Sequence, residues 1–250
     1  MKRVYFILIF LPAMFLYSQN FDGAYPSWFL HPEANSNIYI GFGYNNYSAE
    51  EDAVSMSSLF NECIVDGQLN MYSTEGSSDM YRDSDYYYYF DPDNKVVDED
   101  QLQPLDRFTI NLIYGNYIQA FASDSNYVLS AGDSSLTEIP EWIKTTYYED
   151  SDYYYGVGMY TAIGNKIDAW KTSEEKGIFN IILNNAVQVY KIKYSADSYE
   201  NDDFVYDEII SYKFRYRLRN IETIERYPDY ENELFYTLVR IKKDDVLAAF

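Results

Sequence analysis

The sequence predicts an α+β fold made of two tandem copies of one unit, in which a long helix packs on an antiparallel sheet. A Pro-x-Trp motif that ends at Trp28 returns at Trp142, 114 residues later. An apolar segment that ends in Gly-x-Gly, residues 38–43, returns at residues 153–158, 115 residues later. A helical pattern follows each Gly-x-Gly. Three features in one order at a nearly constant spacing are typical of an internal repeat.

The first copy is expected to open with a buried strand at 37–43. Ser48 and Glu51 have the spacing of a capping box, in which each side chain satisfies a free backbone N–H at a helix start. The helix that follows is predicted from apolar residues at helical spacing. These are Ala53, Met56, Phe60, Cys63 and Ile64. Gly67 is expected to end it, since glycine favours the residue after a helix.

A strand is expected next, near 68–74. Residues 117–121 and 127–131 flank a polar segment and are predicted to form a hairpin that closes the first copy. Between the strand at 68–74 and this hairpin, residues 77–100 form an insert rich in Asp and Tyr, with four consecutive tyrosines. We expect this insert to be an exposed loop of low order.

The second copy carries the same signals. A strand is predicted at 153–158, a long helix at about 164–186, and an alternating strand at 187–194. Asp168-Ala169 is expected to take the place that Asp52-Ala53 holds in the first copy. The inward face of this helix is predicted to hold Ile167, Trp170, Ile178, Ile181 and Ile182.

The end of the second copy is predicted to be a hairpin of 220–226 with 234–242, joined by turn residues around 227–232. For residues 203–219 the sequence permits either a helix or a strand. The alternation of Tyr212, Phe214, Tyr216 and Leu218 with basic residues favours a strand from 210 to 219. The predicted unit is therefore β-α-β-(α)-β-β.

Residues 1–19 are predicted to be a secretory signal peptide. Lys2 and Arg3 precede an apolar run of signal length, which is shorter than the roughly 20 apolar residues of a membrane span. An uncleaved anchor is the alternative, because the cleavage site lacks a small-x-small pattern. The expected boundaries are then 20–131 for the first copy, 132–138 for a linker and 139–250 for the second copy.

The charge is strongly acidic, with a formal net charge of −21. Such a chain repels phosphate backbones, so we expect no nucleic-acid partner. Most of the excess lies in the first copy. The basic stripe from Lys213 to Arg219 is expected to face acidic groups of the same protein.

Taken together, the Pro-x-Trp, the Gly-x-Gly strand, the long helix and the final strand pair resemble the LPP-twenty family of small bacterial envelope lipoproteins. A similar domain occurs in a flagellar-ring assembly protein. The resemblance is best over 140–243 and degenerate over 26–131. It implies an envelope location and a dodecin-like fold, and it supplies no catalytic residues. The chain departs from the family because no cysteine follows the signal to carry a lipid.

Motifs that would carry chemistry are incomplete. His31 stands alone, without a nucleophile or metal ligands around it in the sequence. Cys63 is the only cysteine and is expected to be a buried small hydrophobe. Gly41-x-Gly43 lacks the third glycine of a dinucleotide site. Asp91-Pro92-Asp93-Asn94-Lys95 has Val96 where a calcium loop needs glycine.

We therefore expect no catalytic residues, no cofactor and no metal site. The leading hypothesis is a non-enzymatic exported envelope protein, periplasmic or associated with the outer membrane or surface. It would bind another envelope protein or itself through tyrosine-rich sheet surfaces. The alternative is a small-ligand or cation-binding module that uses the acidic, tyrosine-rich insert. An unrecognised hydrolase is a third, weaker hypothesis.

Overall fold

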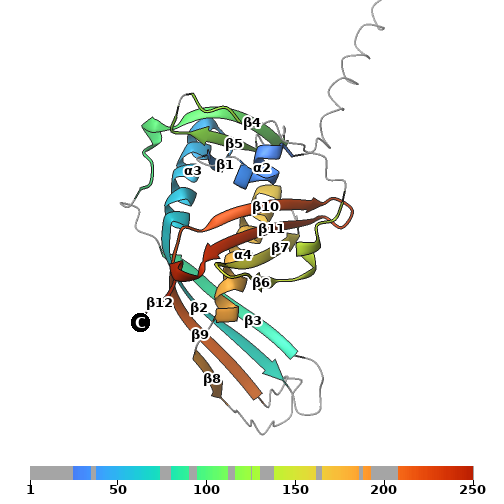
Figure 1. The fold of residues 1–250 in the computed structure, drawn as a ribbon. Coiled ribbons are helices and arrows are strands. Elements are labelled where there is room, and N and C mark those ends of the chain that lie inside the picture. The colour runs from blue at the N-terminus through green and yellow to red at the C-terminus, as the bar shows by residue number, and fades with distance from the viewer. Residues whose placement is uncertain are drawn as a thin grey trace, which may run out of the picture.

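A computed structural model describes residues 25–34, 38–73, 80–89, 95–111, 116–124, 126–129, 138–161, 165–185, 188–192 and 208–249. Within these residues the fold is mixed α+β, with three antiparallel sheets and two main helices packed on strands. The sheets follow one another along the long axis of the molecule (Figure 1). The expected signal peptide 1–19, and nearly all of the expected linker 132–138, lie outside the described residues.

The first sheet has the order β1-β5-β4 and belongs to the first half of the chain. Its strands are β1 (Ile38–Gly43), β5 (Asn116–Ala122) and β4 (Gln103–Asn111). Helix α3 (Asn46–Asn61) packs against β1 (Figure 1). The last strand, β5, therefore lies between the first strand and the one that precedes it in the chain.

The second sheet repeats this order in the second half of the chain. Its core is β7-β11-β10, and the short β6 (Tyr147–Glu149) extends it beyond β7. The bounds are β7 (Tyr153–Thr161), β11 (Leu234–Lys242) and β10 (Glu222–Asp229). Helix α4 (Lys166–Asn185) packs against β7 and β11. The predicted strand at 153–158, the long helix and the terminal hairpin are confirmed.

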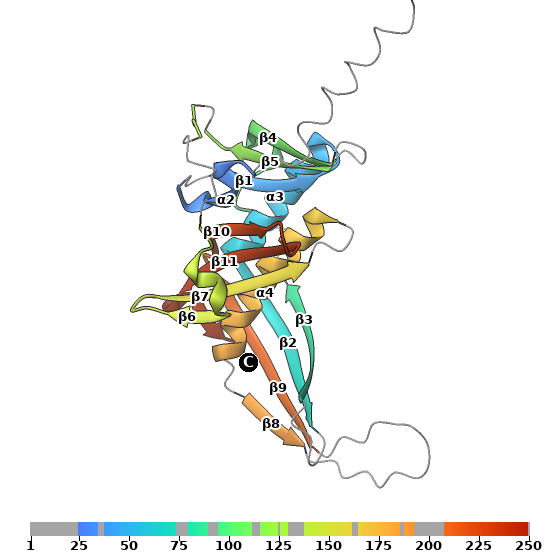
Figure 2. The ribbon, with the colours of Figure 1, turned by 90° about the vertical axis from the view of Figure 1, so that its right-hand side faces the viewer.

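The third sheet joins the two halves. Strand β2 (Glu62–Ser73) pairs along its whole length with β9 (Glu208–Arg219). On its other side β2 pairs with β3 (Met80–Tyr89), and β9 pairs with β8 (Gln188–Ile192) and β12 (Val246–Ala248). This sheet projects away from the other two (Figures 1 and 2). The two halves of the chain are therefore joined through a shared sheet.

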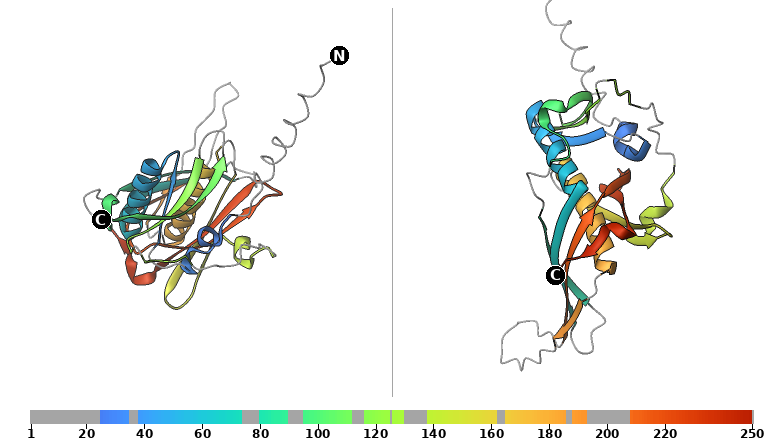
Figure 3. Two further views of the ribbon diagram at one scale, coloured as in Figure 1. Left: turned by 90° about the horizontal axis from the view of Figure 1, so that it is seen from above. Right: turned by 60° about the vertical axis from the view of Figure 1, so that its left-hand side comes forward.

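Short helical segments fill the gaps between these layers. The one-turn α2 (Ser27–Leu30) and η1 (Pro32–Ala34) lie against β10, so the start of the first half contacts the sheet of the second. Figure 3 shows α2 beside that sheet from two further directions. The other turns are η2 (Glu99–Gln101), η3 (Glu141–Lys144) and η4 (Lys243–Asp245).

The Gly-x-Gly motifs mark where each long helix approaches its strand. A Cβ built on Gly41 would lie 1.8 Å from the Ala49 carbonyl oxygen, and one on Gly158 would lie 1.7 Å from that of Ser173. Only glycine permits so close a backbone approach. The expected match of Ala53 with Ala169 is wrong, because Ser173 and Gly177 are the residues that face the glycines of β7.

Aromatic rings from both halves share one core cluster. Trp170 on α4 is fully buried and meets Phe29 edge-on at 5.2 Å, Phe235 at 4.7 Å and Tyr25 at 5.3 Å between ring centroids. Each such pair adds about 0.5–1.5 kcal/mol beyond simple burial. The five predicted inward residues of this helix are all buried.

Helix α3 starts and ends earlier than the sequence pattern predicts. Its N-cap is Asn45, whose side chain accepts the Ser48 N–H at 2.9 Å while the Ser48 Oγ accepts the Asn45 N–H at 3.1 Å. The capping box is thus displaced by three residues, and Glu51 is not part of it. The helix ends at Asn61 and passes directly into β2, because β-branched Ile64 and Val65 favour a strand and β9 supplies its pairing partner.

Three further expectations on the first half need correction. The expected loop 77–100 contains strand β3 over 80–89, which pairs with β2 at every position. Residues 127–129 are not a strand, and β5 pairs with β1 and β4 instead. The helix expected to run to Gly67 is a strand from Glu62 on. The helix end at Asn61 and the pairing of β5 with β1 depend on strands distant in the chain, whereas β3 pairs with the strand directly before it.

In the second half, residues 208–219 form strand β9, so the alternating pattern there indicates a strand correctly. Residues 203–207 lie outside the described part.

Within the described residues, no helix is both long and apolar enough to cross a membrane.

Cys63 is 2% exposed and lies in strand β2, not on the helical stripe that the spacing predicts. Burial, and then the nearby Glu62 carboxylate, raise the pKa of its thiol to about 12. The thiolate is the reactive form, so at pH 8 the folded chain should react with a thiol reagent about a thousandfold more slowly than an exposed cysteine. A colorimetric thiol assay checks this. Full reaction in denaturant is the control, and rapid reaction of the folded chain would contradict the buried position.

Candidate functional site

The outer face of the β6-β7-β11-β10 sheet is rich in tyrosine. Gly156 and Gly158 on β7 face α4, so alternation along the strand directs Tyr153 and Tyr155 to the opposite face. The register adds further tyrosines from the neighbouring strands to that face. The resulting set, named here the tyrosine face, comprises Tyr148, Tyr153, Tyr155, Tyr227 and Tyr236.

The rings of the tyrosine face contact one another across the strands. Tyr148 stacks on Tyr155 with centroids 4.6 Å apart and planes 6° from parallel. Tyr227 and Tyr236 form a second cross-strand pair at 6.3 Å. Tyr148 keeps 36% of its surface exposed and Met159 keeps 43%. The face therefore offers rigid, partly exposed rings to solvent.

The hydroxyls of this face are uncharged donors. Burial, and then a hydrogen bond to Asp150, raise the pKa of Tyr155 to about 12, and its hydroxyl donates to Asp150 Oδ2 at 2.8 Å. Burial also raises the pKa of Tyr148, Tyr227 and Tyr236. Hydrogen bonds from the Asp152 and Tyr153 backbone N–H groups lower the pKa of Asp150, which keeps it ionised as an acceptor.

A tryptophan is fixed to a carboxylate on the outer face of each helix-covered sheet. Trp142 Nε1 donates to Glu225 Oε2 on β10 at 2.9 Å, and Trp28 Nε1 donates to Asp106 Oδ2 on β4 at 2.9 Å. Both acids directly follow an irregularity in strand register. The Pro-x-Trp motifs mark both tryptophans in the sequence, whereas their acids emerge only when the two penultimate strands are compared.

Acidic groups surround the tyrosine face. Glu149, Asp150 and Glu231 are exposed at its rim. Two lysines near them are engaged: Lys243 pairs with Glu149 at 3.1 Å, and Lys144 pairs with Glu141 at 2.7 Å. The local charge therefore follows the acidic character of the whole chain, whose net charge is −21.

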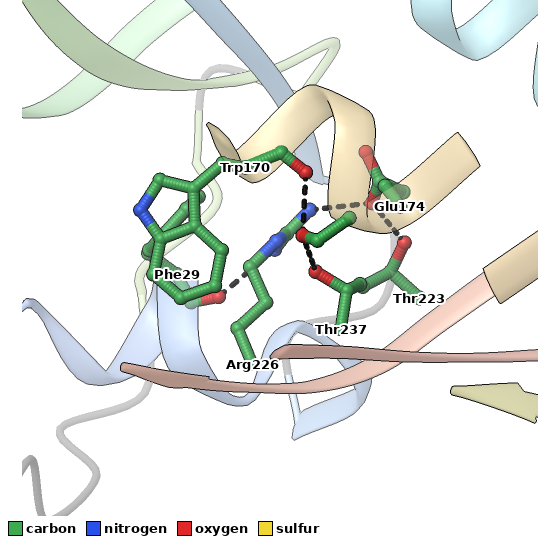
Figure 4. A network of polar contacts seen from close by, with 7 residues as sticks. Phe29, Trp170, Glu174, Thr223, Arg226 and Thr237 are labelled. Carbon is green, nitrogen blue, oxygen red and sulfur yellow. Dashed lines mark hydrogen bonds and ion pairs between the residues drawn. The ribbon is translucent and has the colours of Figure 1, made fainter. Parts of the chain in front are cut away.

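A buried ion pair lies behind the tyrosine face, between α4 and β10 (Figure 4). Arg226 Nη2 donates to Glu174 Oε1 at 2.7 Å, and the two side chains are 4% and 3% exposed. Arg226 Nη1 donates to the Phe29 carbonyl at 2.9 Å, and the Thr223 hydroxyl donates to Glu174. The guanidinium thus connects α4 and β10 of the second half to α2 of the first.

A different ion pair connects α3 of the first half to α4 of the second. Asp52 on α3 accepts the Phe42 N–H at 2.9 Å and pairs with Lys171 on α4. In the sequence, Asp52 is notable only for its expected match with Asp168 in the second copy.

His31 and the basic stripe, both singled out in the sequence, have acidic neighbours in the structure. His31 ends α2 and lies 3.7 Å from Glu225. The predicted partner of the basic stripe is confirmed for two of its members, because Glu62 of the first half pairs with Arg217 at 3.7 Å and Arg219 at 2.9 Å. Residues 91–94 of the calcium-like segment lie outside the described residues. In the part of the chain that the structure describes, no three His, Cys, Asp or Glu side chains gather as a metal site.

None of the protein-family models, curated proteins or solved structures compared with the chain matches it.

Proposed function

We propose that this chain is a non-catalytic, exported cell-envelope protein that binds a protein partner through the tyrosine face. The observation that carries the proposal is the cluster of paired rings with uncharged hydroxyls on one sheet surface. Tyrosines suit protein interfaces because each ring supplies a large contact area and a hydrogen-bond donor at low entropic cost.

The chemistry of the rim favours a basic partner. Exposed carboxylates surround the rings, and two nearby lysines, Lys243 and Lys144, are already paired within the chain. A partner surface with Lys or Arg around an apolar centre would complement both parts. Electrostatic attraction of this kind speeds association and weakens as salt rises.

We also propose that the chain holds two diverged copies of one unit, as the repeated motifs predict, and that this unit resembles the LPP-twenty family. Three repeated details support this. Both halves place the last strand of the unit between the first and the penultimate one. Both fix a tryptophan indole to an acid that follows a strand irregularity. Both bring a Gly-x-Gly strand against a helix backbone. An export signal at 1–19 would place the chain in the periplasm or at the cell surface.

A photo-reactive amino acid placed at Tyr148 tests the binding function in cells that express the chain. We expect a discrete protein crosslink at 148 and none at Tyr47, which is 62% exposed on α3. With the captured partner purified, Tyr148→Ser should weaken binding by about tenfold or more, and Tyr47→Ser should leave it unchanged. Equal crosslinking at both positions, or binding that does not respond to Tyr148→Ser, would contradict the proposal.

A further inference from the structure

A pocket of about 500 Å³ lies between the two halves, beside the edge strand β10. Strand β1, helix α3 and η1 of the first half form one wall, and β10, Arg240 of β11 and Glu174 of α4 form the other. Its volume is in the range of small-molecule sites in proteins. The apolar part of its lining includes Ile38, Ile40, Met56, Phe60, Ile221 and Ile224.

The charged groups of the pocket are already paired with one another. Glu174 holds Arg226 at the buried end. Arg240 is held at the rim by Glu222 at 2.6 Å and by Glu33 at 2.8 Å. Three carboxylates thus face two guanidinium groups. An anionic ligand would find no uncommitted cation in this lining, so a fatty acid or a phosphate ester is disfavoured.

One polar atom at the buried end lacks a partner. Arg226 is 3% exposed, and its Nε–H is buried without an acceptor, although its two other nitrogens are both bonded. Buried donors in proteins are nearly always satisfied, by protein atoms or by a bound molecule. Arg226 is one of the residues that line the pocket, so the lining combines a long apolar wall with a residue whose buried donor has no acceptor.

We propose that the pocket binds a small uncharged amphipathic molecule. Its aliphatic body would lie against the isoleucines and Phe60, and its hydroxyl or ester oxygen would lie at the Arg226 end. This inference does not depend on the tyrosine face, because none of its five tyrosines lines the pocket.

Displacement of the neutral fluorophore N-phenyl-1-naphthylamine from the purified full-length chain tests the ligand class. We expect saturable fluorescence, displaced by decanol at concentrations at least tenfold below those needed for decanoate, with decyltrimethylammonium as the cationic comparison. Absence of saturable binding would overturn the proposal. Displacement by either charged compound as effective as that by decanol would overturn the uncharged class.

Two substitutions locate the binding. Ser57→Trp fills the pocket from α3, and Val96→Trp, at a position 46% exposed, narrows its mouth without altering the core. Ser55→Trp, on an exposed position of the same helix outside the pocket, is the matched control. Both pocket variants should lose fluorophore binding by tenfold or more while the control keeps it. If Val96→Trp and Ser55→Trp bind alike, the fluorophore occupies another site and the proposal fails.

Discussion

Replacing Arg226 by methionine should lower the free energy of unfolding by about 3–5 kcal/mol, the usual cost of breaking a buried ion pair. The substitution leaves the Glu174 carboxylate buried with Thr223 as its remaining partner in the network. It also removes the donor to the Phe29 carbonyl, which connects the two halves. Urea denaturation followed by circular dichroism measures the change.

Two further variants distinguish the effect of losing the ion pair from the effect of losing the arginine side chain. Arg226→Met combined with Glu174→Met should recover much of the loss, since replacing both partners by apolar groups is often close to neutral. Arg240→Met serves as the matched control and should cost about 1 kcal/mol or less, because its acids at the rim are 49% and 44% exposed. An Arg226→Met variant as stable as Arg240→Met would refute the structural role of the network.

Gly158→Ala should destabilise the chain by about 3 kcal/mol or more, at the upper end of overpacking effects. The new Cβ would lie 1.7 Å from the Ser173 carbonyl oxygen and 2.5 Å from the Gly177 nitrogen. Both atoms belong to the backbone of α4, so no side-chain rotation relieves the contact and the helix must move away from β7. Urea denaturation again supplies the measurement.

The partner glycine on the helix is the control for Gly158. A Cβ on Gly177 would first meet the Val239 side chain, at 2.9 Å. Alanine also improves helix propensity by about 1 kcal/mol, which offsets part of the cost. Gly177→Ala should therefore be clearly less damaging than Gly158→Ala. Equal losses would mean that the close backbone approach is not what Gly158 provides.

Sequence periodicity worked best where an element buries its face against near neighbours in the chain. The spacing of Ile167, Trp170 and Ile178 predicts the buried side of α4 correctly, because a helix of 20 residues needs no distant partner to show its period. The terminal hairpin is predicted for the same reason, since β10 and β11 are separated by one short turn.

Periodicity failed in the first half of the chain, where strand pairing changed the outcome. Cys63 and Ile64 continue the helical spacing of α3, yet they lie in β2 because β9 offers a full ladder of hydrogen bonds there. The tyrosine-rich residues 80–89 read as a polar loop, yet they form β3 along the other side of the same strand. A short apolar or aromatic run cannot by itself show which partner it will meet.

The sequence alone determined the mixed α+β class, the order of most elements and the Gly-x-Gly positions, because these depend on local spacing and on glycine's missing Cβ. Only the tertiary structure decided how the halves join, which acids hold the tryptophans and which rings form the tyrosine face. Those features bring together residues far apart in the chain, such as Glu62 with Arg219 and Phe29 with Arg226. Such pairings minimise exposed apolar area and unpaired charge over the whole molecule, and no local pattern encodes that balance.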